Sequence, residues 1–327
     1  MTGFVAEPGY AGRPVLITGA TGFLGTHLSR ALLSGGAQVH AIRRDSTRAT
    51  RLPAEGIRWH TADLLDILSL RTAIDEASPE IVFHLAAYGT TFAQRDRDET
   101  FRVNVEGSLN LWTAMENASS RLVHTGSCGE YGRKRGQVGE DIACEPTWLY
   151  PATKNASVVM LSTLARESGR EVVTLRPFGP YGAADDPGRV LPQVIRTLLA
   201  GKEMKATAGE QLRDYAHVDD HVQAFMLAGL APLRANGVIY NIGSGEIITL
   251  RTLVETAAQA IGGDALKRVR FGALPYRDGE VWEMCCDTGA ARTDLGYEPR
   301  VGLADGIART VDWYRTAGES RPRNQEH

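Results

Sequence analysis

The sequence has few cysteines, little net charge and no long hydrophobic run. Its four cysteines are Cys128, Cys144, Cys285 and Cys286, and their spacing matches neither a zinc site nor a disulfide framework. The net charge of −3 is too close to zero for a nucleic-acid or membrane-surface binder. No apolar stretch approaches the length of a transmembrane helix. We therefore expect a reduced, cytoplasmic globular protein that binds no metal, nucleic acid or membrane.

Short apolar segments alternate with helical patterns through the first half of the chain. The expected strands are Pro14–Thr18, Gln38–Ile42, Ile57–His60, Ile81–Leu85, Arg121–Thr125 and Glu171–Leu175. The expected helices are a segment that ends near Leu33, and Ile67–Ala77, Asn104–Ala118 and Tyr150–Ser168. This alternation predicts an α/β fold with a doubly wound parallel sheet of the Rossmann type.

The pattern changes after Arg176, where glycines and prolines gather. Further elements are expected at Leu191–Ala200, Asp219–Leu230, Val238–Ile242, Leu250–Ile261 and within Val301–Tyr314, the third of them a strand and the others helices. We expect a dinucleotide-binding domain over residues 1–180, to which segments near 215–243 return. Residues 181–327 should mainly form a smaller α/β substrate domain.

Three glycines follow the first expected strand at the spacing Gly-x-x-Gly-x-x-Gly. Gly19 would permit a tight turn, Gly22 would let a pyrophosphate approach the backbone, and Gly25 would let the helix pack on the strand. An anion would then lie at the helix N-terminus, where free N–H groups and the helix dipole favour it. An ordinary strand–helix turn is the alternative, but a strand and a helix on the correct sides favour a phosphate loop.

Two arginines, Arg43 and Arg44, end the second expected strand. A carboxylate at this place binds the ribose 2′-hydroxyl of NAD, whereas an arginine accommodates the 2′-phosphate of NADP. Guanidinium groups match phosphate oxygens through paired hydrogen bonds. A solvated basic turn is the alternative, and Asp45 lies just beyond. The turn favours NADP(H), with NAD as the alternative cofactor.

Tyr150 and Lys154 lie four residues apart at the start of an expected helix, so they share one face. A free phenol, with a pKa of about 10, is a poor base at neutral pH. A nearby lysine lowers that pKa and can also hold the nicotinamide ribose. The pair predicts proton exchange with a hydroxyl or carbonyl oxygen. Cys128 has no histidine beside it, and we expect it to serve packing.

The glycine loop with Thr18 before it, and the Tyr150–Lys154 pair after it, resemble the short-chain dehydrogenase/reductase superfamily in its extended form, which acts on nucleotide sugars. The resemblance covers nearly the whole chain. It implies a catalytic set of Ser127, Tyr150 and Lys154, in which Ser127 hydrogen-bonds the reacting oxygen, with Thr125 as the alternative hydroxyl. It implies the cofactor-binding residues Gly19, Thr21, Gly22, Phe23, Leu24, Gly25, Arg43, Arg44, Asp63, Leu64, Leu85, Ala86, Ala87, Asn104, Tyr150, Lys154 and Pro177.

Two of these positions have plainer alternatives. Asp63 matches the family's adenine-side aspartate, but it could also cap the following helix. His84 precedes the segment that lies along the cofactor in the family, and taken alone it should be a half-buried, hydrogen-bonded histidine without a chemical role.

The resemblance also implies a nucleotide-diphosphate sugar as substrate. Arg213 and Arg277 match arginines that hold the diphosphate, and with Thr125 and Ser127 they form the implied substrate-binding set. Gly179 stands where many members carry an asparagine that contacts the sugar nucleotide. For Asp219, an N-cap of the next helix is the plain alternative.

Residues around Tyr131 narrow the implied reaction. Members that eliminate water carry acidic residues where this chain has Cys128 and Gly129, which argues against a 4,6-dehydratase. Glu130 directly precedes Tyr131 and should point elsewhere. The stretch resembles reductases of nucleotide-activated 4-keto-6-deoxy sugars such as the GDP-4-keto-6-deoxymannose reductases, which implies NADPH-dependent reduction of a 4-keto group. A nucleotide-sugar 4-epimerase with retained NAD and a non-catalytic cofactor-binding protein are the alternatives.

Asn104–Ala118 and Tyr150–Ser168 are long expected helices, and the second carries more apolar residues than one buried face requires. Corresponding helices pack across a two-fold axis in many relatives, so we expect a homodimer with a four-helix interface.

Overall fold

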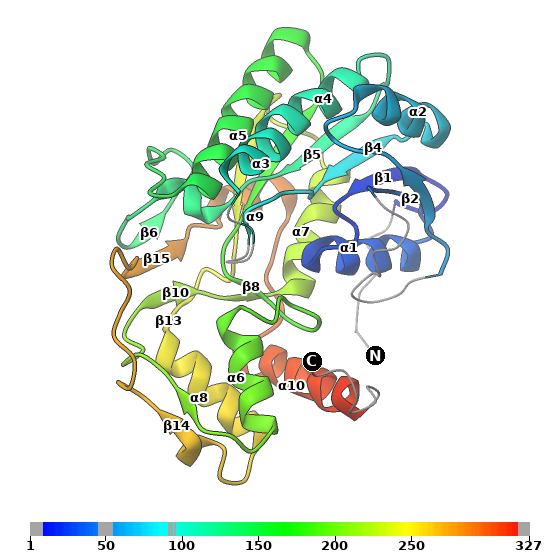
Figure 1. Ribbon diagram of the computed structural model, residues 1–327. Helices are drawn as coiled ribbons and strands as arrows, with labels where there is room; N and C mark the ends of the chain where they lie inside the picture. Colours follow the sequence, from blue (N-terminus) through cyan, green and yellow to red (C-terminus); the bar gives the residue numbers. More distant parts are fainter. Residues whose placement is uncertain (1–8, 45–54, 91–93, 95, 320–327) are drawn as a thin grey trace.

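A seven-stranded parallel sheet forms the centre of the computed structural model, which describes residues 9–44, 55–90, 94 and 96–319 (Figure 1). The strand order is β12-β7-β5-β4-β1-β2-β3, and every neighbouring pair is parallel. The strands are β1 Pro14–Thr18, β2 Gln38–Arg43, β3 Arg58–Thr61, β4 Ile81–His84, β5 Arg121–Thr125, β7 Val172–Pro177 and β12 Val238–Ile242. The predicted Rossmann-type sheet is confirmed, and Asp45 lies outside the described residues.

Helices cover both faces of this sheet, which is why its strands are apolar on both sides. In β1, Val15 and Ile17 pack into one core and Leu16 packs into the other, because successive side chains point to opposite faces. The first core includes residues of α1 Phe23–Ser34, α7 Val218–Leu230 and α9 Gly289–Leu295. The second includes residues of α2 Ile67–Ala77, α4 Gly107–Ala114 and α5 Leu149–Ser168.

A smaller body lies below the main sheet in Figure 1 and is built largely from the later part of the chain. Its four-stranded sheet has the order β13-β10-β15-β6, and α6, α8 and α10 share one apolar core. Its elements are β6 Gln137–Val138, α6 Val190–Leu199, β10 Leu212–Asp214, β13 Ile247–Thr249, α8 Leu250–Ile261, β15 Glu283–Cys286 and α10 Leu303–Glu319. Two short parallel pairs join β8 Pro180–Tyr181 to β11 Ala216–His217, and β9 Met204–Lys205 to β14 Val269–Arg270.

Two strands cross between these bodies. β12, far along the chain, completes the main sheet beside β7, and β6, from the first half, pairs with β15 of the smaller sheet. We propose two units divided near residue 180, with these two strands exchanged between them. The exchange places the loop before β6 beside the loop before β15.

The helix expected at Asn104–Ala118 differs in both of its bounds. Helical structure begins with α3 Arg97–Phe101, continues through a π-helical turn at Arg102–Glu106 and ends with α4 at Ala114. Asp96 explains the early start, because its carboxylate accepts the Glu99 N–H as an N-cap. Polar residues rather than an apolar stripe form this first turn, so the apolar pattern gave no sign of it.

Two suggested helix caps are wrong by a few residues. Asp66, rather than Asp63, caps α2 by accepting from Leu68 and Ser69 N–H groups. His217, rather than Asp219, caps α7, and its ring nitrogen accepts the Asp219 N–H. A cap must directly precede the first helical residue to reach these donors, a condition that Asp63 and Asp219 do not meet.

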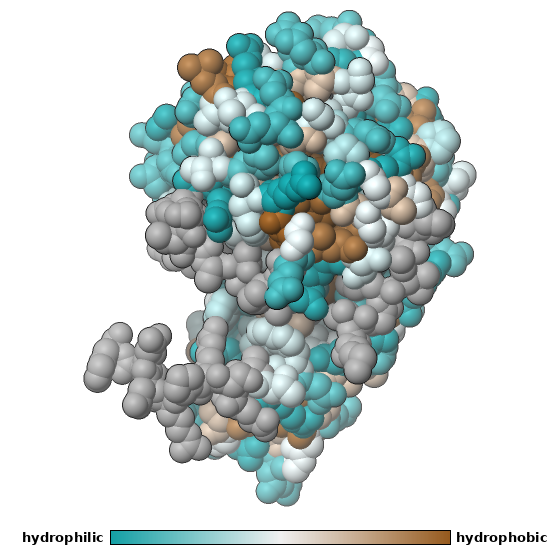
Figure 2. Space-filling model, turned by 90° about the vertical axis from the view of Figure 1, so that its right-hand side faces the viewer, coloured by the Kyte–Doolittle hydropathy of each residue, from teal (hydrophilic) through white to brown (hydrophobic). Residues whose placement is uncertain are grey.

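The described helices include none that is both long and apolar enough to span a membrane. The face on the right of Figure 1 is mainly hydrophilic, with one hydrophobic area near its centre (Figure 2). All four cysteines are free thiols, and Cys285 and Cys286 are buried in β15.

Candidate active site

The turn from β1 to α1 is too crowded for side chains at two of its glycines. Gly19 has φ +75°, and a Cβ on it would lie 2.6 Å from the Ala86 nitrogen. A Cβ on Gly25 would lie 2.1 Å from the Gly19 oxygen. α1 begins at Phe23 after Gly22, which has no capping side chain, so the first-turn N–H groups remain available to an anion. Thr21, Phe23 and Leu24 are half-buried around this helix start.

The segment after β4 lies directly against this turn. The Ala86 N–H donates to the Thr18 hydroxyl (3.3 Å), which also hydrogen-bonds His84 Nδ1 at 2.7 Å. His84 is fully buried rather than half-buried, and its Nε2 contacts the Ser108 hydroxyl at 3.0 Å. Burial lowers the pKa of His84 to about 3, so the ring is neutral and its role is structural. The residues that follow it, Leu85, Ala86 and Ala87, are half-buried.

Arg43 and Arg44 have different surroundings. Arg43 ends β2 and stacks on the Trp59 ring, with its guanidinium carbon 4.9 Å from the ring centroid. Its Nε is buried and has no hydrogen-bond partner within the described parts of the chain. Arg44 is exposed and pairs with Glu99 at 3.2 Å. Stacking uses the flat face of the Arg43 guanidinium and leaves its N–H edge for an anion, so Arg43 is the stronger candidate for a phosphate contact.

Three other positions predicted to face the cofactor make local contacts. The Asp63 carboxylate accepts the Leu65 N–H at 2.9 Å, and Leu64 is buried in the second core. The buried Asn104 amide accepts the Tyr88 N–H at 2.8 Å and donates to the Thr153 hydroxyl at 2.9 Å. Asn104 thereby ties the loop after β4 to the helix that carries Lys154.

Ser127 follows β5 and caps a 3₁₀ turn, η2 Cys128–Tyr131. Its Oγ accepts the Gly129 N–H at 3.1 Å. A Cβ on Gly129 would lie 3.3 Å from Ser127 Oγ and 3.1 Å from Pro151 Cβ, so the turn rests on the first turn of α5. The hydroxyl proton therefore remains for an oxygen bound beside Tyr150. Thr125 Oγ1 is also buried without a partner among the described residues.

Tyr150 and Lys154 lie on α5, with Tyr150 half-buried and Lys154 almost fully buried. Burial lowers the pKa of the Lys154 ammonium to about 8, opposed by the charge of Glu130. We expected Lys154 to lower the pKa of Tyr150. Instead, burial raises that pKa, and the negative charge of Glu130 adds to the effect. Within the chain itself, the desolvation of the phenolate outweighs the positive charge of Arg189, which lowers the pKa.

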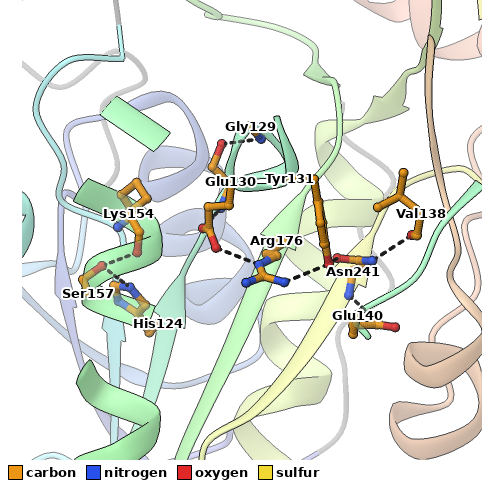
Figure 3. A network of polar contacts seen from close by, with 11 residues as sticks. His124, Gly129, Glu130, Tyr131, Val138, Glu140, Lys154, Ser157, Arg176 and Asn241 are labelled. Atoms are coloured by element: carbon orange, nitrogen blue, oxygen red, sulfur yellow. Dashed lines mark hydrogen bonds and ion pairs between the residues drawn. The ribbon is translucent and has the colours of Figure 1, made fainter. Parts of the chain in front are cut away.

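Glu130 does point away from the reacting groups, and its contacts show why. It is fully buried and forms an ion pair of 2.7 Å with Arg176 of β7 (Figure 3). This pairing removes it as a free acid or base for eliminating water. Cys128 packs beside Tyr131 and Phe178, and burial raises the pKa of its thiol to about 11, as expected for a packing residue.

The two arginines predicted to hold a diphosphate are connected through Glu280. Arg213 of β10 donates to the Glu280 carboxylate at 2.9 Å and also to the Val281 carbonyl. Arg277 is exposed and lines a cavity of about 360 Å³ together with Glu280, Arg133 and other residues of the loop before β6.

The backbone at residue 179 accounts for the glycine found there. Its φ is +39°, and a Cβ on it would lie 2.1 Å from the Asp214 oxygen, so an asparagine does not fit here. Pro177, the last residue of β7, is buried just before it. Arg189 was not predicted from the sequence. It precedes α6, donates to the Pro180 carbonyl at 2.8 Å and lies near enough to lower the pKa of Tyr150.

Comparisons with known proteins agree with this geometry. The model of the NAD dependent epimerase/dehydratase family matches residues 15–243. The chain is 34% identical over 318 residues to a UDP-glucose 4-epimerase of Mycolicibacterium smegmatis, covering 93% of this chain and 99% of that relative. It is 29% identical over 324 residues to a dTDP-glucose 4,6-dehydratase of Streptomyces niveus, covering 92% of each.

A solved structure extends the match to three dimensions. The Thermus thermophilus UDP-glucose 4-epimerase in complex with NAD superposes with a TM-score of 0.83 at 29% identity, covering 93% of this chain and 99% of that one. The phosphate loop, the Tyr150–Lys154 pair and these matches lead to one conclusion. The chain belongs to the NAD dependent epimerase/dehydratase family, in the extended short-chain dehydrogenase/reductase form, and is an NAD(P)-dependent enzyme.

Proposed function

We propose that the protein is an NADPH-dependent reductase of the 4-keto group of a nucleotide-activated 4-keto-6-deoxyhexose. The proposal rests on the contact between the Ser127 turn and the first turn of α5, the helix that carries Tyr150 and Lys154. A hydrogen-bond donor, a proton donor and a buried cation at one place suit the reduction of a carbonyl.

Each of the three residues would have a distinct role. Ser127 would donate its hydroxyl hydrogen to the carbonyl oxygen, since its own oxygen already accepts from Gly129. Tyr150 would protonate the oxygen as negative charge develops, and its raised pKa keeps the phenol protonated at neutral pH. Lys154 would hold the ribose hydroxyls of the cofactor. When bound, the nicotinamide supplies the hydride chemistry that these residues cannot provide.

The residues present fit a dinucleotide with a 2′-phosphate. Gly19 and Gly25 leave room that side chains would fill, and the α1 N-terminus offers N–H groups to the pyrophosphate. Arg43 supplies a buried N–H donor that has no partner among the described residues, at the end of β2, where the adenosine ribose lies in this fold. These features support NADP(H) rather than NAD.

Two arguments support a nucleotide-diphosphate sugar as the substrate. Arg213 pairs with Glu280, Arg277 lines a cavity together with Glu280, and two guanidinium groups suit a diphosphate. The solved UDP-glucose 4-epimerase of Thermotoga maritima, 27% identical with a TM-score of 0.84, holds UDP-glucose. Elimination of water is disfavoured, because Glu130 is engaged by Arg176.

A nucleotide-sugar 4-epimerase with retained NAD is the second candidate. The names of the relatives favour it, since the Mycolicibacterium smegmatis and Thermus thermophilus proteins are UDP-glucose 4-epimerases. The same three side chains would serve, because an epimerase removes and then returns a hydrogen at one carbon. Tyr150 would give a proton in the reducing step and take one in the oxidising step, so the candidates differ in the cofactor, for which the position of Arg43 supports NADPH.

One assay of the purified protein separates the two candidates. We expect NADPH consumption with a panel of GDP- and dTDP-activated 4-keto-6-deoxyhexoses, and no interconversion of UDP-glucose and UDP-galactose without added cofactor. Tightly bound NAD together with that interconversion would contradict the reductase and establish the epimerase.

Replacing the phenol tests the proton donor. Tyr150→Phe should keep the fold and cofactor binding but lower kcat by about 10²- to 10⁴-fold, because only the proton donor is removed. Tyr240→Phe is the matched control, since the Tyr240 hydroxyl bonds Asp294 away from the site. Activity of Tyr150→Phe within a factor of two of the wild type, at unchanged cofactor affinity, would remove Tyr150 from the mechanism.

Replacing Arg43 tests the cofactor. Arg43→Ala should weaken NADPH binding by about tenfold or more, because a charge-assisted hydrogen bond is lost. NADH lacks the 2′-phosphate, so its dissociation constant should hardly change. Arg44→Ala should have a smaller effect, since Arg44 is already paired with Glu99. Equal wild-type affinity for NADH and NADPH would overturn the cofactor assignment.

We also propose a homodimer formed through the α4 and α5 faces. Three apolar side chains are exposed there, with Phe101 of α3 at 54%, Leu109 of α4 at 40% and Val159 of α5 at 58% exposure. Light scattering at micromolar concentration should give twice the chain mass, and Val159→Lys should shift it toward one chain. A wild-type mass of a single chain would exclude this assembly.

A further inference from the structure

The carboxylate of Glu130 is fully buried directly behind the Ser127 turn. One of its oxygens accepts the Ser127 N–H at 2.6 Å, and the other accepts from Arg176 Nε at 2.7 Å (Figure 3). A Cβ on Gly126 would lie 2.7 Å from the first oxygen, so Gly126 leaves the space that the carboxylate fills. Both oxygens are thus engaged, one with the turn and one with β7.

Arg176 is itself held from a second direction. Its Nη1 donates to the Tyr131 hydroxyl at 2.8 Å, and that hydroxyl donates to Asn241 Oδ1 of β12 at 2.8 Å. The Asn241 N–H donates to the Glu140 carboxylate at 2.7 Å. A buried ion pair with its remaining groups satisfied is stiff, because moving either partner leaves an uncompensated charge. The orientation of Glu130 is therefore fixed by two strands of the main sheet.

This chain of contacts bears on the direction of the Ser127 hydroxyl. The Ser127 N–H is bound by Glu130, and its Oγ is bound by the Gly129 N–H. The residue is thus held at its backbone and at one lone pair, and the hydroxyl hydrogen is what remains to be donated.

We infer that Glu130 is a positioning residue that, locked by Arg176, holds Ser127 in the orientation that binds the reacting oxygen. The inference rests on the proposed role of Ser127. The acid directly before Tyr131 would then serve a reductase by fixing a neighbour, whereas acids at the preceding positions serve water elimination in relatives. The Glu130 charge also raises the pKa values of Tyr150 and Lys154, which places it within electrostatic reach of both.

Amide hydrogen exchange tests the geometry whether or not a substrate is known. In Glu130→Gln the exchange of the Ser127 N–H should become at least about tenfold faster, because a charge-assisted hydrogen bond is weakened. Glu140→Gln is the matched control, since it alters a carboxylate at the far end of the same network and should leave this amide unchanged. Unchanged exchange in Glu130→Gln, or equal acceleration in both variants, would overturn the inference.

A double-mutant cycle tests the link to catalysis. Glu130→Gln should lower kcat by up to about 100-fold with little change in the Kd for NADPH, because the hydroxyl loses its orientation. The same substitution in a Ser127→Ala background should have little further effect, since Glu130 acts through Ser127. Equal losses in both backgrounds would show a general structural role and contradict the inference.

A second variant covers the case in which Glu130→Gln does not fold. Arg176→Lys keeps the charge but loses the forked contact to Glu130 and Tyr131, and it should give the same pattern in the exchange and in the cycle. Wild-type protein that turns over none of the proposed substrates would count against the proposed function, whereas turnover with independent effects of Glu130 and Ser127 would count against the positioning role alone.

Discussion

The parallel order of the seven strands places the carboxyl ends of β1, β2, β4, β5 and β7 along one edge of the sheet. Many of the groups proposed to bind cofactor and substrate lie at or just after these ends, among them Gly19, Arg43, Ala86, Ser127 and Pro177. Because this order is set by two apolar cores on opposite faces, the site depends on packing far from any polar side chain. The loops after β1 and β4 are in close contact at Gly19 and Ala86, and together they form the surface against which a dinucleotide can bind.

Burial determines the electrostatics of the site more than pairwise attraction does. Burial raises the pKa of Tyr150 and lowers that of Lys154 to about 8. The phenol therefore keeps its proton at neutral pH, and the Lys154 ammonium loses its proton more readily than a free lysine does. Glu130 and Arg176 avoid the cost of isolated charges by pairing with each other.

Local patterns in the sequence predicted the elements well where one apolar face governs them. The helix Ile67–Ala77 and the strands Pro14–Thr18 and Arg121–Thr125 have the expected bounds, because hydrophobic periodicity and turn residues determine them. The start of α3 was missed, since polar residues and the Asp96 cap begin it. The glycine loop and the Tyr150–Lys154 pair were predictable for the same local reason.

Contacts between distant residues could not be predicted in this way. Glu130 and Arg176 are 46 residues apart, and nothing in either segment indicates the other. The pairing of Arg44 with Glu99, which distinguishes it from Arg43, depends on how the loop after β2 meets α3. The effect of burial on Tyr150 also needs the folded structure, because a spacing of four residues shows proximity to Lys154 but not the loss of water around the phenol.

If a dissociable NADPH reduces a carbonyl at C4 of the substrate sugar, the transferred hydrogen can be followed directly. The measurement uses NADPH with deuterium at both positions of nicotinamide C4, and mass spectrometry and NMR of the product sugar. We expect one deuterium at C4 of the sugar for each NADPH consumed. Product formation without deuterium at C4, and without net consumption of NADPH, would contradict it.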